Sequence, residues 1–182
     1  MIADPEFLPF EPESFDLVVS ALALQYVNDL PGTLLQIRRA LAPDGLLLAA
    51  LAGGQTLHEL RAVLAQAEAE IAGGASPRVA PLSDLRDMGA LLQRAGFALP
   101  VADVDAVVVR YDNLFALARD LRAMGATNAL VERAKRPLRR AVFFRAAEIY
   151  AQKFADRDGR IRATFEFVWL SGWAPHESQQ KP

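Results

Sequence analysis

Two short apolar runs, separated by a stretch with helical periodicity, open the chain's hydrophobic pattern. The first run, 17–21, is rich in β-branched residues and follows the turn signal at 11–14, so it predicts a buried strand. Asn28 and Asp29 offer an N-cap, Pro31 suits a first helical turn, and apolar residues at 34, 35, 37 and 41 form one stripe. The turn residues at 43–45 then lead into a second apolar run, 46–51. This strand, helix and strand predict a right-handed βαβ unit in a parallel sheet.

The rest of the pattern continues the alternation of helices and strands. Helices are predicted at about 56–71, from the capping residue Ser83 to about Ala95, at 113–124 and at about 137–154. Strands are predicted at 97–111, which is rich in valine, and at 164–170, before a polar tail. The fold class is therefore α/β, with helices flanking a sheet.

Composition narrows the possible functions by exclusion. The 182 residues carry a formal net charge of −2, and 52% of them are apolar, which suits a globular protein without a nucleic-acid footprint. Without cysteine there is neither a disulfide nor a thiolate metal site, and the two histidines, His58 and His176, lie far apart. We therefore expect no metal. No apolar run is long enough to span a bilayer and the start lacks signal-peptide features, so we expect a cytoplasmic protein; peripheral contact with the inner membrane stays open.

Three motifs near the start resemble class I S-adenosylmethionine (SAM) methyltransferases. They are Asp4 with 8–10, the run 14–20 (Ser-Phe-Asp-Leu-Val-Val-Ser), and 41–48 with its Pro-Asp-Gly turn. The resemblance implies a partial Rossmann-like sheet with remaining strand order 4-5-7-6, the last strand antiparallel. It also implies cofactor contacts, in which Asp4 faces the adenine amino group. The residues that the resemblance implies as cofactor contacts are Asp4, Pro5, Ser20, Ala21 and Gln25. From the pattern alone, Asp4 and Ser20 could equally cap a turn and a loop.

The resemblance begins partway through the family's pattern. Only three residues precede Asp4, so the glycine-rich loop and the first three strands have no counterpart here. We therefore expect residues 1–175 to be the C-terminal part of such a domain, with a helical insertion at about 113–155 and a tail at 176–182. The full-length parent would bind SAM, whereas this fragment alone would bind it weakly or not at all and be inactive. Strand 17–21 would become an exposed edge and could support self-association.

Later motifs resemble two narrower families. The segment 23–31 is similar both to the malonyl-carrier-protein methyltransferases of biotin synthesis and to the methyltransferase-like assembly factor 5 of respiratory complex I. The segments 54–61, 73–78, 121–128 and 172–179 favour the second. That family is implied to hydroxylate an arginine on a complex I subunit, or to act as a non-catalytic docking module. The alternative partner is an acyl carrier protein, the substrate of a carboxyl methyltransferase.

Three further side chains are candidates for catalysis, although the resemblance assigns no catalytic residue. Arg78 follows Ser-Pro in a loop and could hold a carboxylate or phosphate, with a surface salt bridge as the alternative. Tyr26 and Tyr111 lie near predicted strand ends, where they could line a substrate pocket or simply mark the boundary of the core.

Overall fold

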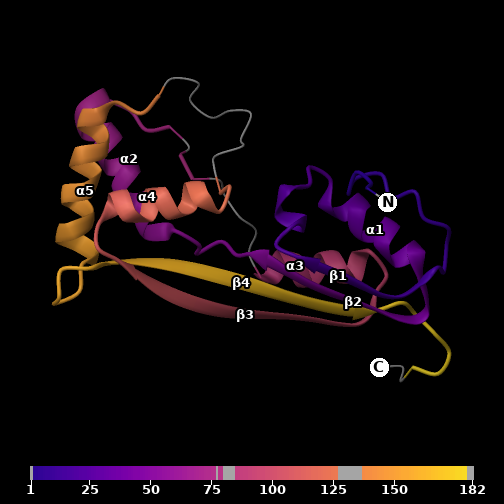
Figure 1. The fold of residues 1–182 in the computed structure, drawn as a ribbon. Helices are drawn as coiled ribbons and strands as arrows, with labels where there is room; N and C mark the ends of the chain where they lie inside the picture. Colours follow the sequence, from indigo (N-terminus) through magenta and orange to yellow (C-terminus); the bar gives the residue numbers. More distant parts are fainter. Residues whose placement is uncertain (1, 77, 80–84, 127–136, 180–182) are drawn as a thin grey trace. The chain divides into compact units, whose positions relative to one another are not determined.

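The computed structural model describes residues 2–76, 78–79, 85–126 and 137–179. Figure 1 shows the succession of elements along the chain. In chain order they are β1 (Phe15–Ala21), the 3₁₀ helix η1 (Leu24–Tyr26), α1 (Leu30–Ala40), β2 (Leu41–Ala52), α2 (His58–Ala72), α3 (Leu85–Arg94), β3 (Ala98–Tyr111), α4 (Leu114–Ala123), α5 (Arg140–Phe154) and β4 (Ile161–Trp173).

The four strands form one mixed sheet in the order β1-β2-β4-β3. β1 pairs with β2 in parallel, and β2 pairs with β4 in antiparallel orientation. This is the order 4-5-7-6 with an antiparallel last strand that the resemblance implied, and it is confirmed. The helices and strands expected within the described residues are found, with ends shifted by a few residues; the cap expected at Ser83 and a short helix expected at about 128–135 lie outside the described residues.

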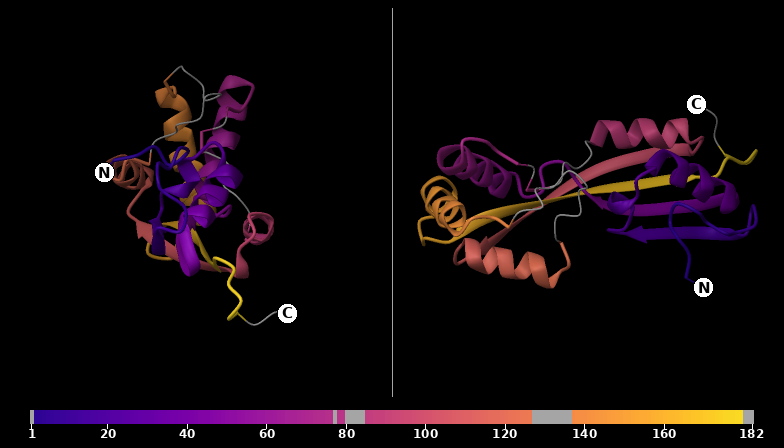
Figure 2. Two further views of the ribbon diagram at one scale, coloured as in Figure 1. Left: turned by 90° about the vertical axis from the view of Figure 1, so that its right-hand side faces the viewer. Right: turned by 90° about the horizontal axis from the view of Figure 1, so that it is seen from above.

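The chain divides into two compact units, and the division falls within β3 and β4. The first unit comprises residues 1–54, 82–105 and 166–182. In it, α1 and α3 lie on the same face of the sheet, as Figure 2 shows. Their buried side chains, among them Leu34, Ile37 and Leu92, pack against Leu47 of β2 and Leu170 of β4. Because side chains alternate along a strand, the residues between these point to the opposite face, which is the exposed one.

Interactions of nearby residues set where helix α1 begins, and the start of β2 sets where it ends. The Asp29 side chain accepts a hydrogen bond from the Gly32 amide at 2.9 Å, so it is the N-cap that the sequence predicted. The helix ends at Ala40, and β2 follows at once rather than after the predicted turn. The turn residues instead bulge out of the ladder between the pairs Phe15–Leu41 and Leu17–Leu46. Gly45 is required there, because a Cβ would lie 2.8 Å from the Ala42 carbonyl oxygen.

The second unit comprises residues 55–81 and 106–165. Helices α2, α4 and α5 share its core, in which Val63, Leu117, Ile149 and Tyr150 are almost completely buried. Of the helical insertion expected at about 113–155, α4 and α5 are described, while residues 127–136 lie outside the described part of the chain.

Candidate functional site

The carboxyl end of β1 leads into a tightly bonded turn. Leu22, directly after the strand, has a left-handed backbone (φ 54°), which is uncommon for a bulky residue. The Gln25 side chain turns back and its Nε2 donates a hydrogen bond to the Leu22 carbonyl at 2.7 Å. This bond fixes the orientation of the Gln25 side-chain amide, so the amide oxygen points away from the Leu22 carbonyl. That oxygen, Oε1, is buried and accepts no hydrogen bond within the described residues.

The segment around Asp4 is held against the loop that follows η1. Asp4 accepts a hydrogen bond from the Glu6 amide at 2.9 Å through its side chain, and one from the Phe7 amide at 3.0 Å through its carbonyl. The Glu6 carboxylate accepts bonds from the backbone amide of Asn28 and from its side-chain amide, the latter at 2.8 Å. The Glu6 carbonyl accepts a bond from Gln36 of α1 at 2.8 Å. The structure thus ties Glu6, which follows Pro5, to Asn28, two residues beyond η1, the helix that carries Gln25 and Tyr26.

This arrangement suits a ligand that bears an amino group. The carboxyl ends of parallel strands are where open α/β sheets bind ligands. The Asp4 carboxylate and the buried Gln25 oxygen are both acceptors, and an exocyclic ring amine is a donor. A buried acceptor without a partner is costly, so a donor there would stabilise the turn. Acceptors of this kind are what the amino group of an adenine ring would need.

Ser20 and Ala21 also line a shallow hollow of about 390 Å³ on the exposed face of the sheet. Leu48, Val101 and Trp169 form much of its wall, and polar groups contribute little. Asp4, Pro5 and Gln25 are not among its lining residues. The hollow is therefore better suited to bind an apolar group than a charged nucleoside.

Arg78 is bound to a buried carboxylate of the second unit. Its Nε and Nη2 lie 2.9 and 2.6 Å from Oε1 of Glu68, whose side chain is only 5% exposed. The other oxygen of Glu68 accepts the Ser76 amide at 2.7 Å. Glu68 therefore ties Ser76 and Arg78 to α2. The salt-bridge alternative for Arg78 is the one that the geometry favours, although the pair is largely buried rather than on the surface.

Tyr111 also lies in the second unit and Tyr26 in the first. The Tyr111 hydroxyl donates to Asp120 at 2.6 Å. Burial, and next this bond to a carboxylate, raise the pKa of Tyr111 to about 12. It is therefore a neutral donor at ordinary pH and a poor base. Tyr26 is 64% exposed beside Gln25, where it lies next to the candidate cofactor residues.

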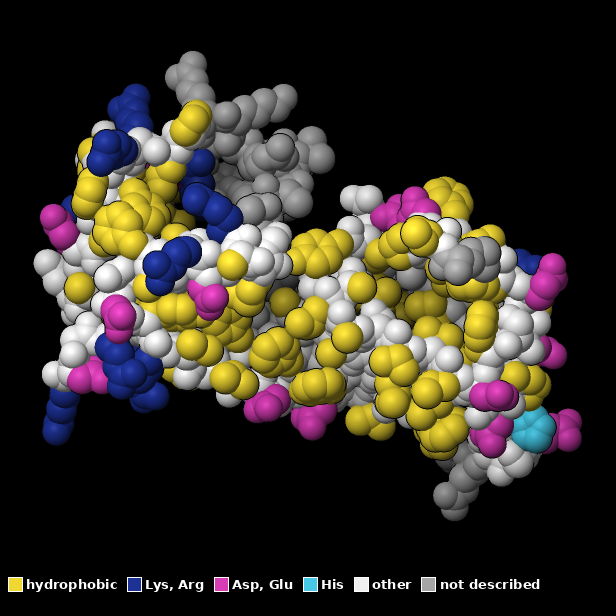
Figure 3. Space-filling view, viewed as in Figure 1, with side chains coloured by type: hydrophobic (Ala, Val, Ile, Leu, Met, Phe, Trp, Pro, Cys, Tyr) yellow, Lys and Arg dark blue, Asp and Glu magenta, His cyan; other side chains and the backbone are white. Residues whose placement is uncertain are grey.

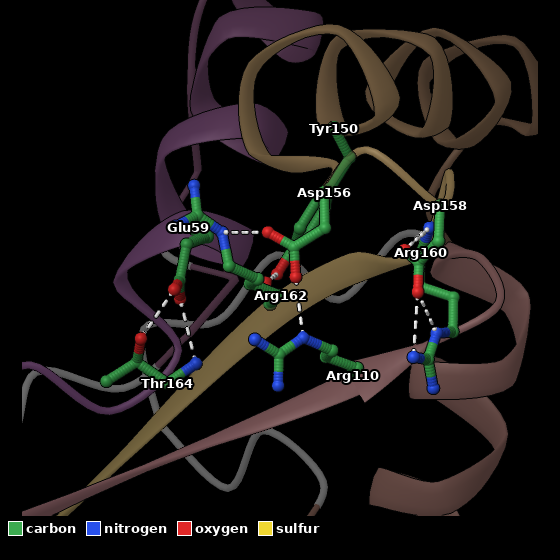
Figure 4. A network of polar contacts seen from close by, with 8 residues as sticks. All are labelled: Glu59, Arg110, Tyr150, Asp156, Asp158, Arg160, Arg162 and Thr164. Atoms are coloured by element: carbon green, nitrogen blue, oxygen red, sulfur yellow. Dashed lines mark hydrogen bonds and ion pairs between the residues drawn. The ribbon is translucent and has the colours of Figure 1, made fainter.

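The second unit holds a polar network that the sequence analysis did not find (Figure 4). Glu59, almost fully buried in α2, accepts bonds from the Thr164 amide at 3.1 Å and its hydroxyl at 2.5 Å. The Tyr150 hydroxyl donates to the Arg162 carbonyl at 2.8 Å. Burial, and next the Glu59 charge, raise the pKa of Tyr150. The sequence signal for this network was a glutamate, Glu59, among the apolar positions of α2. Its partner could not be found from the sequence, because Thr164 lies 105 residues further along the chain.

An aspartate in the same network joins two strands. Asp156 accepts a hydrogen bond from Nε of Arg110 in β3 at 2.6 Å and lies 3.4 Å from Nε of Arg162 in β4. Figure 4 shows the Asp156 carboxylate between the two guanidinium groups. These contacts engage both oxygens of the Asp156 carboxylate, so the network supports β3, β4 and the end of α5.

Within the described ranges, no group of three or more histidine, aspartate and glutamate side chains is arranged to hold a metal ion. Nor does any helix there have the length and apolar character to cross a membrane.

The fold and the first part of the sequence are similar to those of methyltransferases. Residues 1–49 match the family described as methyltransferase domain. A Bacillus halodurans protein assigned as a methyltransferase has the same fold, with a TM-score of 0.60 over 96% of this chain and 76% of its own, at 16% identity. YcgJ of Bacillus subtilis is similar, with a TM-score of 0.56, 16% identity, and coverage of 96% and 70%.

Longer sequence matches lead to two groups of proteins. The chain is 44% identical over its full 182 residues to arginine-hydroxylase NDUFAF5, mitochondrial, of Danio rerio and of Homo sapiens, and covers 56% and 52% of those proteins. It is 42% identical, over 95% of its length, to malonyl-[acyl-carrier protein] O-methyltransferase of Laribacter hongkongensis, of which it covers 56%. Both resemblances seen in the sequence are confirmed. The chain spans about half the length of these relatives.

Proposed function

We propose that the full-length protein binds SAM at the carboxyl end of β1. Asp4, Pro5, Ser20, Ala21 and Gln25 are the proposed contacts. All five lie inside the stretch that matches the methyltransferase domain. The observation that carries the proposal is the buried Gln25 oxygen without a partner, in a loop beside the Asp4 segment.

In this proposal the chain's own residues orient the cofactor. The Asp4 carboxylate and the Gln25 oxygen accept from the adenine amine, while Ser20 and Ala21 form the end of the strand against which the nucleoside lies. When bound, SAM supplies an electrophilic methyl group on a sulfonium, so the protein mainly has to align the acceptor and exclude water. Tyr26, exposed in the same loop, is the proposed contact with the substrate.

The proposed substrate is a group carried on another protein. The names of both kinds of relative point that way, one to arginine hydroxylation and the other to a malonyl group on a carrier protein. The match to the arginine-hydroxylases covers the whole chain, so an arginine of a respiratory complex I subunit is the first candidate, with a role in complex I assembly. A docking module without catalysis is the alternative within that family. A cytoplasmic location, with or without contact to the inner membrane, is part of the same proposal, and fractionation of expressing cells tests it.

Calorimetric titration of the full-length protein with SAM tests the cofactor. Gln25→Leu removes, at similar volume, both the Oε1 acceptor and the Nε2 donor that bonds the Leu22 carbonyl, and is expected to weaken binding by at least about 3- to 10-fold, the worth of one hydrogen bond. Gln66→Leu, a matched change on the exposed side of α2, should leave binding unchanged. No binding by the unaltered protein would refute the cofactor, and equal binding by Gln25→Leu would refute the role of Gln25.

The 182-residue chain alone is a separate case. Its sequence contains no glycine-rich loop that follows a strand and opens a helix, so we propose weak or no binding of SAM and no activity for it. A micromolar site measured in this chain would contradict that.

A second experiment separates the candidate reactions. The full-length protein is incubated with SAM and either malonyl-loaded acyl carrier protein or a complex I subunit, and the products are analysed by mass spectrometry. Methyl addition to the carrier, together with rescue of a biotin auxotroph, would support the carboxyl methyltransferase. Oxygen addition to an arginine, in a reaction also supplied with dioxygen and a two-electron reductant so that the second oxygen atom leaves as water, would support the hydroxylase. Partner binding that persists without either product, and that survives substitution of Asp4 and Ser20, would identify a docking module.

A further inference from the structure

The imidazole of His58, at the start of α2, is oriented by the backbone next to it. Its Nδ1 lies 3.1 Å from the Gln55 carbonyl oxygen. Because a carbonyl oxygen only accepts, Nδ1 carries the hydrogen, and Nε2 of the neutral ring then has a lone pair and is an acceptor. Within the described part of the chain, Nε2 forms no hydrogen bond. The Phe154 ring lies at 90° to the imidazole, with the ring centres 6.5 Å apart, and limits its rotation.

A buried carboxylate lies behind this imidazole. The Glu59 side chain is 5% exposed, and its Oε2 lies 3.5 Å from Nδ1 of His58. The Thr164 amide donates to Oε2 at 3.1 Å and the Thr164 hydroxyl to Oε1 at 2.5 Å, as Figure 4 shows, so both oxygens accept, as those of an ionised carboxylate do. The Leu57 amide donates to the Thr164 carbonyl at 2.7 Å. All these bonds lie within residues 55–164, which therefore hold the His58–Glu59 pair in place by themselves.

The His58–Glu59 pair has the character of a site for a cation. The lone pair on Nε2 accepts from an N–H group, and the negative charge of Glu59 favours a positively charged one. A charge shielded from water acts more strongly on its neighbours than an exposed charge does. A carboxylate would meet both a lone pair and a negative charge, which is unfavourable. Of the two candidate groups in the proposed function, the guanidinium of an arginine therefore suits the pair, and the carboxylate of a malonyl group does not.

The charge of the chain as a whole does not provide the same preference. The formal net charge is only −2, and Lys and Arg side chains lie among Asp and Glu side chains on the face that Figure 3 draws. Exposed charges separated by more than about 8 Å are largely screened at physiological salt. A preference for a cationic over an anionic substrate therefore depends on charges close to the bound group.

We propose that His58, backed by Glu59, binds the guanidinium group of the substrate and so selects an arginine over a malonyl group. This inference rests on the proposed function, since it chooses between the two candidate substrates named there. Nε2 of His58 accepts a hydrogen bond from a guanidinium N–H. Glu59 acts through His58 as a positioning residue, and its charge stabilises the bound cation. No proton is transferred, because a guanidinium stays charged at ordinary pH.

The first test determines which ring nitrogen of His58 carries the proton. Nuclear magnetic resonance of the full-length protein with ¹⁵N-labelled histidine distinguishes the two forms, and His58→Asn identifies the His58 signals by their loss. The neutral ring is expected to carry its hydrogen on Nδ1. A hydrogen on Nε2, the form that a solvated histidine favours, would overturn the proposal, because no lone pair would then face the substrate.

The second test measures binding of two small probes to the full-length protein by calorimetry. N-acetylarginine amide represents the arginine and monomethyl malonate the malonyl group. We expect the arginine probe to bind more tightly than the malonate probe. His58→Asn keeps a donor to the Gln55 carbonyl but has no acceptor at the position of Nε2. It should raise the Kd of the arginine probe about 10-fold or more, the contribution of one hydrogen bond to a charged group.

Two further variants and the cofactor titration complete the second test. His58→Gln, whose longer amide can reach the position of Nε2, should lose less affinity than His58→Asn, and His176→Gln in the tail should lose none. His58→Asn should bind SAM as tightly as the unaltered protein. Equal Kd values for the arginine probe in the unaltered protein and His58→Asn, or tighter binding of the malonate probe, would overturn this inference and leave the SAM proposal standing. No SAM binding by the unaltered protein would refute the cofactor alone.

Discussion

Replacing Arg78 with methionine removes the cation that holds the buried Glu68 carboxylate. Glu68 is 5% and Arg78 19% exposed, and two guanidinium nitrogens contact one carboxylate oxygen at 2.6 and 2.9 Å. Breaking a fully buried pair costs about 3–5 kcal/mol, and an exposed pair about 0–1. Because Arg78 keeps some contact with water, we expect Arg78→Met to lower the free energy of unfolding by about 2–3 kcal/mol.

Urea unfolding followed by far-ultraviolet circular dichroism measures this loss, because Glu68 lies on a helix. Arg145→Met is the matched control: Arg145 pairs with Glu70 of the same helix at 2.7 Å, but both side chains are more than a third exposed, so its effect should be much smaller. Adding Glu68→Leu to Arg78→Met should recover much of the stability, since no buried charge then remains unpaired. If Arg78→Met is as mild as the control, or if the double variant is worse than the single one, the pair does not stabilise the fold and a binding role for Arg78 returns.

Two further predictions concern the core and a tyrosine. Leu34→Ala should lower the free energy of unfolding by about 3–4 kcal/mol, because Leu34 is fully buried, while Leu35→Ala next to it should lower it by less than about 0.5 kcal/mol. Tryptophan fluorescence during urea unfolding compares the two variants, since both tryptophans belong to the same unit as α1. Equal losses would contradict the assignment of Leu34 to the core. Tyr111 should ionise near pH 12, so its contribution to stability is complete below the unfolded value of about 10 and is lost as the pH rises through 12. The ultraviolet absorbance difference between the unaltered chain and Tyr111→Phe gives this titration, and a midpoint near 10 would contradict the burial of Tyr111 and its bond to Asp120.

Local sequence patterns were sufficient to predict most of the helices and strands. Asp29 and Pro31 mark the start of α1 because the N-cap bond spans only three residues, and the valine-rich run 97–111 marks β3 through its strand-type composition. The extent of β2 was not predictable in the same way, because the bulge at 43–45 is decided by pairing with β1. Strand order came from the family resemblance rather than from periodicity, which carries no information about neighbours in space.

The candidate site shows a similar division. The motifs pointed to Asp4, Ser20 and Gln25, but only the folded chain shows that Glu6 bonds Asn28 and that the Gln25 oxygen is buried without a partner within the described residues. The structure places Tyr26 in one unit and Arg78 and Tyr111 in the other.

By itself, the sequence determined the order of the described helices and strands, the βαβ start and the resemblance of residues 1–49 to a methyltransferase domain, since each depends on residues close together in the chain. Only the tertiary structure decided which charges are paired and which apolar face stays exposed. Glu59 meets Thr164 across 105 residues, and Val19 is exposed although its run reads as a buried strand. The physical reason is that burial and ion pairing depend on what packs against a side chain, and that neighbour is supplied by distant parts of the chain.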